Sequence, residues 1–151
     1  MSDARFSDGA PGPLRLLARD PEDLTVLAAL VQDAVFPASE AAWRPRERRF
    51  AMLLNRFRWE ERDRHPPERV RSILAVNEAV AVASDGVDRA ADTVLSVLAV
   101  EFAPGPDGTG HVVLTLAGDG AIRVEVEALD VQLRDVTRPY QAPSGQVPAH
   151  E

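Results

Sequence analysis

Hydrophobic and polar residues alternate along most of the chain, which is the pattern of half-buried β-strands. The clearest run extends from Arg48 to Trp59, where Phe50, Met52 and Leu54 fall on one face and the residues between them on the other. Similar runs before and after it predict an antiparallel meander of about six to seven strands. These runs cover residues 14–19, 40–44, 70–76 with an extension to 84, 93–102, 111–116 and 121–126.

Helical spacing replaces this alternation near both ends of the predicted domain. Asp20 and Pro21 open the first helix, because aspartate is a good N-cap and proline suits the first helical position. Apolar residues then recur three and four positions apart as far as Val35, and Pro37 stops the pattern. A second, closing helix is predicted over residues 127–136. Its apolar positions are Leu129, Leu133 and Val136.

The predicted fold is therefore a single α+β domain over residues 14–137, a mostly antiparallel meander with an N-terminal and a C-terminal helix. A curled meander capped by a C-terminal helix also describes the pleckstrin-homology-like barrel, an analogy of fold that carries no function. Residues 1–13 and 138–151 are polar and rich in small residues or proline, so we expect a disordered arm and a disordered tail.

Composition excludes several kinds of chemistry. The 151 residues include no cysteine, which rules out disulfides, thiolate metal sites and cysteine nucleophiles. The three histidines are not at metal-ligand spacing, and no phosphate-binding glycine loop or nucleophile elbow is found. We expect no metal and no cofactor. Without a signal peptide or an apolar run long enough to span a bilayer, we also expect a cytoplasmic protein with no membrane association.

Charge is distributed unevenly along the chain. The net charge of −7 argues against binding to nucleic acid or an anionic membrane. Ten arginines and five acidic residues nevertheless lie between Arg44 and Arg71, so this segment carries +5 and the remainder −12. We expect most of these arginines to pair with nearby acids such as Glu47, Glu60 and Asp63, which predicts no nucleic-acid binding at physiological salt.

The middle of that segment is the candidate binding site. Aromatic residues interleaved with arginines suit an anionic ligand, since rings stack and guanidinium groups bind phosphate or carboxylate. The candidate ligand- or partner-binding residues are Asn55, Arg56, Arg58 and Trp59. The alternative is a central strand whose aromatic residues lie in the core while the arginine stems cover the sheet edge.

Two functions follow from these observations. The first is a non-enzymatic binding or interaction module, with a protein partner or a homodimer formed through the open sheet edges. The second is an enzyme of unrecognised type with a polar site around Asn55, Arg71 and Glu125. Glu125 and Glu127 share a strand face with Arg123, which a solvated, salt-bridged surface explains equally well.

Several stretches of the chain together resemble a family of small bacterial proteins of unknown function. They are Asp20–Leu24, Leu30–Val35, the run from Arg49 to Glu60, and Gly118–Glu127 followed by Leu129, Leu133 and Asp135. The resemblance covers residues 14–137, and Leu54–Glu60 is its most specific stretch. It implies a cytoplasmic single domain and supplies no activity and no site residues.

Overall fold

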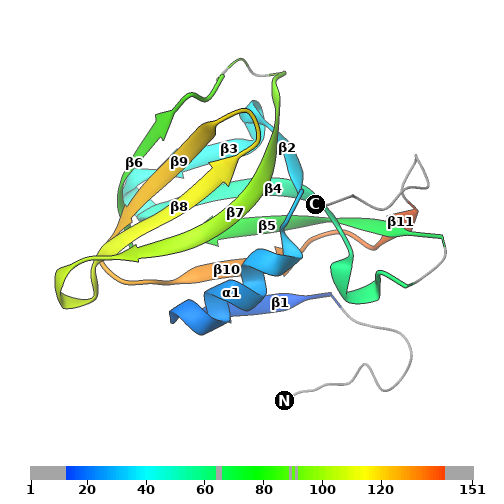
Figure 1. Ribbon diagram of the computed structural model, residues 1–151, viewed down its shortest axis with the longest axis horizontal. Coiled ribbons are helices and arrows are strands. Elements are labelled where there is room, and N and C mark those ends of the chain that lie inside the picture. Colours follow the sequence, from blue (N-terminus) through cyan, green and yellow to red (C-terminus); the bar gives the residue numbers. More distant parts are fainter. Residues whose placement is uncertain (1–12, 64–65, 89, 91, 142–151) are drawn as a thin grey trace.

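The computed structural model describes residues 13–63, 66–88, 90 and 92–141, and most of these residues lie in antiparallel strands (Figure 1). The α-helix is α1 (Pro21–Leu30). The strands are β1 (Arg15–Ala18), β2 (Val35–Pro37), β3 (Ala41–Arg44), β4 (Arg49–Phe57), β5 (Glu68–Val76), β6 (Ala79–Asp85), β7 (Val94–Pro104), β8 (Gly110–Leu116), β9 (Gly120–Val126), β10 (Val131–Asp135) and β11 (Tyr140–Gln141). Short 3₁₀ turns are η2 (Ala38–Glu40), η3 (Pro45–Glu47), η4 (Trp59–Glu61) and η5 (Pro106–Gly108).

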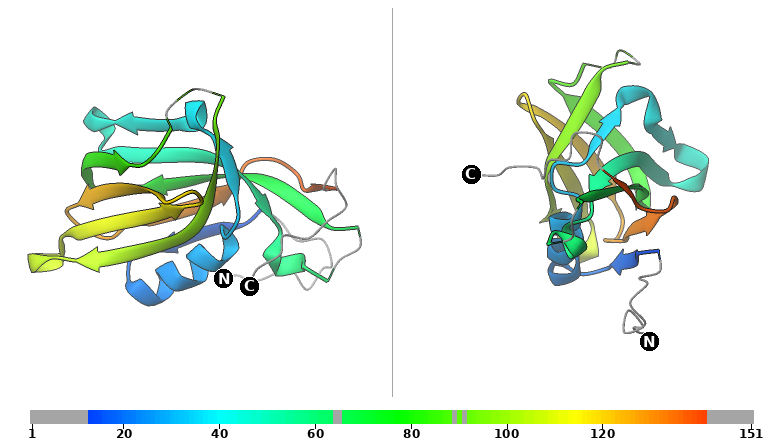
Figure 2. Two further views of the ribbon diagram at one scale, coloured as in Figure 1. Left: turned by 45° about the horizontal axis from the view of Figure 1, so that its top comes forward. Right: turned by 90° about the vertical axis from the view of Figure 1, so that its right-hand side faces the viewer.

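The strands form one curled sheet in the order β1-β10-β5-β4-β2-β7-β8-β9-β6, with β3 added to β4 and β11 added to β5. Strand β2 joins the two halves, because Val35 pairs with Asn55 of β4 and also with Ser96 of β7. Strands β6 to β9 lie over β3 to β5, so the two halves face each other (Figures 1 and 2). We call β1, β10, β5, β4 and β3 the first half, and β7, β8, β9 and β6 the second half.

The core lies between these halves and follows from the alternation in the sequence. Met52, Leu54 and Leu74 point into it from the first half, and Leu114 and Val124 from the second. Helix α1 packs against β1 and β7, and its buried Leu24 and Leu27 join the same cluster. The predicted N-terminal helix is confirmed, and so is its cap, since the Asp20 carboxylate accepts a 2.8 Å hydrogen bond from the backbone N–H of Asp23.

The predicted C-terminal helix is wrong, because residues 131–135 form strand β10. Val131, Leu133 and Asp135 are buried and alternate with exposed Gln132 and Arg134. The apolar residues of this short stretch fit the spacing of a helix as well as that of a strand. Leu133 pairs with Leu74 of β5, so the free edge of β5 selects the strand. No helix follows β9 in the described residues, which removes the element that suggested a pleckstrin-homology-like barrel. The sheet is also larger than predicted.

Helix α1 ends at Leu30, before the predicted stop at Pro37. Asp33 has a φ of +64°, a left-handed conformation that no helix continues. Its backbone N–H donates to the carbonyl of Val97 at 2.8 Å, and the N–H of Val97 donates to Ala34 at 2.9 Å. These bonds draw the chain onto β7, where it continues as the unpredicted strand β2.

The remaining predictions about turns and ends have mixed outcomes. The hairpin at Gly118-Asp119-Gly120 is confirmed, with positive φ at Gly118 and Asp119 as such a turn requires. Tyr140 and Gln141 fall in the predicted tail and pair with β5 as β11. The rest of the predicted arm and tail, residues 1–12 and 142–151, lies outside the described residues. Strands β1 and β6 are the ends of the sheet, and the homodimer predicted from such edges stays a prediction.

Candidate functional site

The side chain of Arg56, on β4 in the first half of the sheet, is fully buried. Its Nη1 and Nη2 donate to the two carboxylate oxygens of Glu60 at 2.9 and 2.8 Å, and Nη2 also donates to Asp135 at 3.0 Å. The Nε group donates to Ser72 Oγ at 3.0 Å, and Nη1 reaches the carbonyl of Phe57 at 3.4 Å. All five guanidinium protons therefore have acceptors within the protein.

The acceptors of Arg56 are themselves held by other strands. The hydroxyl of Ser72 donates to Asp135 at 2.7 Å, and the backbone N–H of Leu14 donates to the second oxygen of Asp135 at 3.0 Å. The network thus ties β4, β5, β10 and the residue before β1 together. Such a saturated cluster fixes strand positions and presents no group to an incoming ligand.

The charges in this cluster stabilise one another. Burial by itself would lower the pKa of Arg56, but its hydrogen bond and ion pair with Glu60 and the charge of Asp135 outweigh burial and raise the pKa. Burial would likewise raise the pKa of Glu60, and the hydrogen bond and charge of Arg56 lower it instead. Both groups are therefore held in their charged forms at neutral pH.

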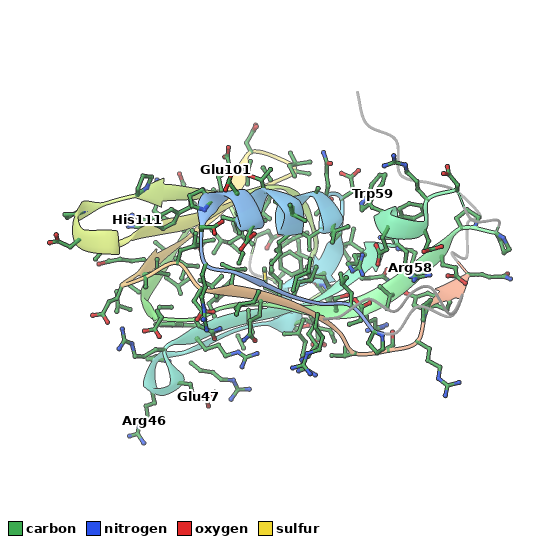
Figure 3. The ribbon with its side chains drawn as sticks, turned by 90° about the horizontal axis from the view of Figure 1, so that it is seen from below. Arg46, Glu47, Arg58, Trp59, Glu101 and His111 are labelled. Carbon is green, nitrogen blue, oxygen red and sulfur yellow. The ribbon has the colours of Figure 1, made fainter. Side chains whose placement is uncertain are left out.

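Arg58 and Trp59 continue this structural role at the end of β4. Arg58 is 4% exposed, and its Nη1 donates to Glu68 Oε1 at 2.6 Å while its Nε is buried without an acceptor in the described residues. The indole N–H of Trp59 donates to the carbonyl of Gln32 at 3.0 Å. The rings of Trp59 and Phe57 pack edge to face, with their centroids 4.8 Å apart. Figure 3 shows Arg58 and Trp59 at the end of the molecule away from His111.

Asn55 is the one candidate residue of the four that faces outward. Its side-chain oxygen accepts from Arg69 Nε at 2.6 Å, its backbone oxygen accepts from Arg69 Nη2 at 3.0 Å, and its amide donates to the hydroxyl of Tyr140. Burial lowers the pKa of Arg69, although Tyr140 and Asp33 act in the opposite direction. Asn55 on β4 thus ties the side chain of Arg69 on β5 to that of Tyr140 on β11, which is the next strand beyond β5.

The residues of the enzyme hypothesis are not brought together. Asn55 and Arg71 are register partners on β4 and β5, whereas Glu125 lies on β9, where it pairs with Ala81 and His111. The hollows found among the described residues do not contain these three side chains. The described part of the chain also contains no cluster of three histidine or acidic side chains suited to a metal ion.

One apolar cavity, by contrast, combines both halves of the sheet. Its volume is about 310 Å³, and it is lined by Phe36, Ala38, Ala41, Trp43, Phe50, Val82, Ser84, Val87, Leu95 and Ile122. Ala41 and Trp43 come from β3 and Val82 and Ser84 from β6, so these two strands form its opposite walls. The hydroxyl of Ser84 and the indole N–H of Trp43 are the polar side-chain groups among these ten. We call this space the seam cavity.

Strand β6 begins against the turn that follows β3, and the two strands do not pair with each other along the seam cavity in the described residues. The backbone N–H of Ala79 donates to the carbonyl of Arg48 at 3.0 Å, and the Arg48 side chain forms ion pairs with Glu78 and Glu127. Beyond this point β3 pairs with β4 and β6 pairs with β9, and the described residues show no pairing between β3 and β6. Arg48 adopts a left-handed conformation, φ +55°, which turns the chain from η3 into β4.

A larger hollow of about 670 Å³ lies along Trp59, Glu60, Glu61, Arg62 and Asp63. Of the described residues, only this one stretch of chain lines it, and none of the strands contributes to its lining. The seam cavity is smaller, but its walls come from six strands, the turn η2 and the loop after β6, and we regard it as the better candidate for a ligand.

The described residues thus form a curled antiparallel sheet with a partly open apolar cavity between its two halves. The chain belongs to the family described as protein of unknown function (DUF2948), whose profile matches residues 14–150. No curated protein and no solved structure matches it. In the part of the chain that the structure describes, no helix is long and apolar enough to cross a membrane.

The sequence analysis did not identify the seam cavity. Alternation placed Phe50 on the inner face of β4, but Phe36 and Ala38 lie in elements of three residues each, which are too short to show a period. The same alternation does place Arg56 inward, two residues after Leu54, so a signal for its burial was present.

Proposed function

We propose that this protein is a non-enzymatic binding domain that takes a small apolar molecule in the seam cavity. The observation that carries the proposal is the set of walls: Trp43, Phe36 and Phe50 on one side and Val82 and Ile122 on the other enclose about 310 Å³. That volume is at the lower end of the range for ligand pockets, about 300–1,000 Å³. The expected ligand is therefore small, with one or two rings or a short branched chain.

The chemistry of the lining supports binding rather than catalysis. Acid–base or nucleophilic work requires a titratable or activated group beside the substrate. The lining is mostly aliphatic and aromatic surface and includes no acidic, basic or histidine side chain. Desolvation of apolar ligand surface would supply most of the binding free energy.

Trp43 provides a direct measurement, because it lines the cavity while Trp59 lies at the far end of β4. We would titrate the Trp59→Phe variant with N-phenyl-1-naphthylamine, a neutral apolar probe, and follow Trp43 emission and probe emission together. Binding should quench Trp43 and enhance the probe. Thermal unfolding of the variant first establishes that it is folded.

Two neighbouring alanines offer a matched pair of variants. Ala41 lines the seam cavity, whereas Ala42 points to the opposite side of β3. Ala41→Phe should fill the cavity and weaken probe binding about tenfold or more, a loss of about 1.4 kcal/mol, and Ala42→Phe should leave it within about twofold. Absence of probe binding, or equal binding by the two variants, would overturn the proposal.

A further inference from the structure

A second surface lies on the outside of the first half of the sheet, on the side of β3 away from the seam cavity. Its outward side chains form rows across neighbouring strands, as the pairing shows. One row across the strands consists of Leu53, Ile73, Arg134 and Arg15. The next row consists of Ala42, Ala51, Ala75, Gln132 and Leu17. The pair Arg44 and Arg49 lies at one end of this surface, and the pair Asn55 and Arg71 lies at the other.

Arginines surround an apolar centre on this surface. We define the arginine face as Arg15, Arg44, Arg49, Arg71 and Arg134, together with the central residues Leu17, Leu53 and Ile73. Four of the five arginines are exposed and Arg49 is half-buried, while Leu17 is 42% exposed. Figure 3 shows nitrogen-tipped side chains along this side of the molecule, with Arg46 and Glu47 at its β3–β4 corner and Glu101 on the opposite side.

Among the described residues, the arginines of this face have no carboxylate partner. The ion pairs of the described residues involve Arg19, Arg48, Arg56 and Arg58. None of the five arginines of the face lies within 4.0 Å of a carboxylate oxygen in the described part of the chain. The expectation that the arginines of residues 44–71 pair with acids therefore holds for Arg48, Arg56 and Arg58. It fails within the described residues for Arg44, Arg49 and Arg71.

The face is also hollowed in two places. A groove of about 330 Å³ is lined by Arg44 and Arg49, by the apolar Leu53 and Ile73, and also by the acidic Glu40 of η2 and Glu47 of η3. A second hollow of about 210 Å³ follows the pairing of β1 with β10, beside Arg15, Leu17 and Arg134. An apolar centre with a charged rim is the usual anatomy of a protein interface, in which arginine is enriched.

We propose that the arginine face docks an acidic segment of a partner protein, one that carries apolar side chains between its carboxylates. Each guanidinium group on the rim would donate two hydrogen bonds to one carboxylate of the partner. Leu53, Ile73 and Leu17 would cover the apolar side chains of the partner. This surface and the seam cavity lie on opposite sides of β3, so the two proposals stand or fall separately.

The chemistry of the face favours protein over nucleic acid or lipid. Among the described residues, none of the eight that define the face is aromatic, and the ring of Tyr140 on the same side of the sheet is tied to Asn55 by a hydrogen bond. Base stacking on aromatic rings is a main source of single-strand affinity. The net charge of −7 repels a long polyanion or an anionic membrane, whereas a short acidic segment meets only the local arginines.

The test uses a fluorescently labelled twelve-residue peptide of alternating glutamate and leucine, and measures anisotropy at low and at physiological salt. The pair Arg71→Glu with Arg134→Glu should weaken binding about tenfold or more, because each change turns an attraction into a repulsion. The control is Arg123→Glu, an exposed arginine on β9 of the second half, which should change binding by no more than about twofold.

Two further probes identify the class of partner. A twelve-nucleotide oligothymidylate and phosphatidylserine vesicles should bind more weakly than the peptide. No peptide binding even at low salt, equal weakening by Arg123→Glu, or tighter binding of the oligonucleotide or the vesicles would each overturn the proposal. Peptide binding that is unchanged in Ala41→Phe would show that the two surfaces are distinct.

Discussion

Arg56 and Asp135 are 79 positions apart in the sequence, and the Nη2 of one lies 3.0 Å from the Oδ1 of the other in the interior of the sheet. Asp135 is at the end of β10, so this contact joins the middle of the chain to its last long strand. The first prediction concerns this pair. Asp135→Ala should lower the free energy of unfolding by about 3–5 kcal/mol, because it leaves Arg56 buried with one carboxylate fewer.

Urea unfolding at pH 7 measures this loss, with Arg19→Ala as the control. Arg19 forms an ion pair with Asp130 at 3.7 Å and its side chain is 69% exposed, so its removal should cost no more than about 1 kcal/mol. Equal effects of the two substitutions would show that the network of Arg56 is not a stabilising cluster.

The second prediction is a pH dependence that Glu60 supplies. Because Arg56 lowers the pKa of Glu60 in the folded state, Glu60 contributes stability that is fully present above its unfolded value, 4.5, and is lost as pH falls through the lower folded value. Glu60→Gln should therefore be less stable than the unchanged protein at pH 7, and the difference should shrink below pH 4.5. Thermal unfolding midpoints from pH 3 to pH 7 test this, and a difference that grows on acidification would contradict it.

The third prediction concerns a close approach of two backbones at the start of β8. A Cβ atom on Gly110 would lie 2.4 Å from the carbonyl oxygen of Ala103 and 2.7 Å from the ring of Phe102. Gly110→Ala should therefore destabilise the protein by about 1–3 kcal/mol through overpacking. Gly108→Asn is the control. No described atom outside the neighbouring residues lies within 4 Å of a Cβ placed on Gly108, and asparagine tolerates the φ of +82° there. This substitution should therefore lower the free energy of unfolding by at most about 0.5 kcal/mol. Urea unfolding should show a larger loss of unfolding free energy for Gly110→Ala than for Gly108→Asn.

The fourth prediction concerns the cap of α1. Asp20→Ala should cost about 1 kcal/mol, because the backbone N–H of Asp23 loses its acceptor, whereas Asp20→Ser should retain most of the stability. Differential scanning calorimetry of the three proteins checks this. If serine were as poor as alanine, the effect would come from charge near the helix start rather than from the capping hydrogen bond.

Much of the sheet could be predicted from the sequence because most of its strands are amphipathic. Alternation around Phe50, Met52 and Leu54 gives the inner face of β4, and the Gly-rich turn after Leu116 gives the β8–β9 hairpin. Strand β10 could not be predicted in this way. Its apolar residues fit a helix as well as a strand, and only the free edge of β5 decides between them.

The candidate binding residues show a similar limit. Arginines interleaved with aromatic residues give the same sequence pattern in a ligand site and in a protein core. Only the positions of Glu60, Ser72 and Asp135 show that the guanidinium group of Arg56 is hydrogen-bonded within the protein. Asp135 could not be assigned as its partner while residues 127–136 were expected to be helical. The arginines that remain available, such as Arg71 and Arg134, lie on separate strands and become neighbours only when the sheet forms.

The pairing of β1 with β10 also has a consequence for the order of events during synthesis. Arg15–Ala18 are among the first described residues to leave the ribosome, and their hydrogen-bonding partners, Val131–Asp135, are among the last. Until then β5 has an unprotected edge, and Arg56 has only part of its acceptors. The hairpins of the second half can form from local contacts as they emerge, whereas the first half is completed only near the end of translation. The nascent chain thus passes through a stage in which this edge is exposed to wrong partners, and chaperone binding would be of most use at that stage.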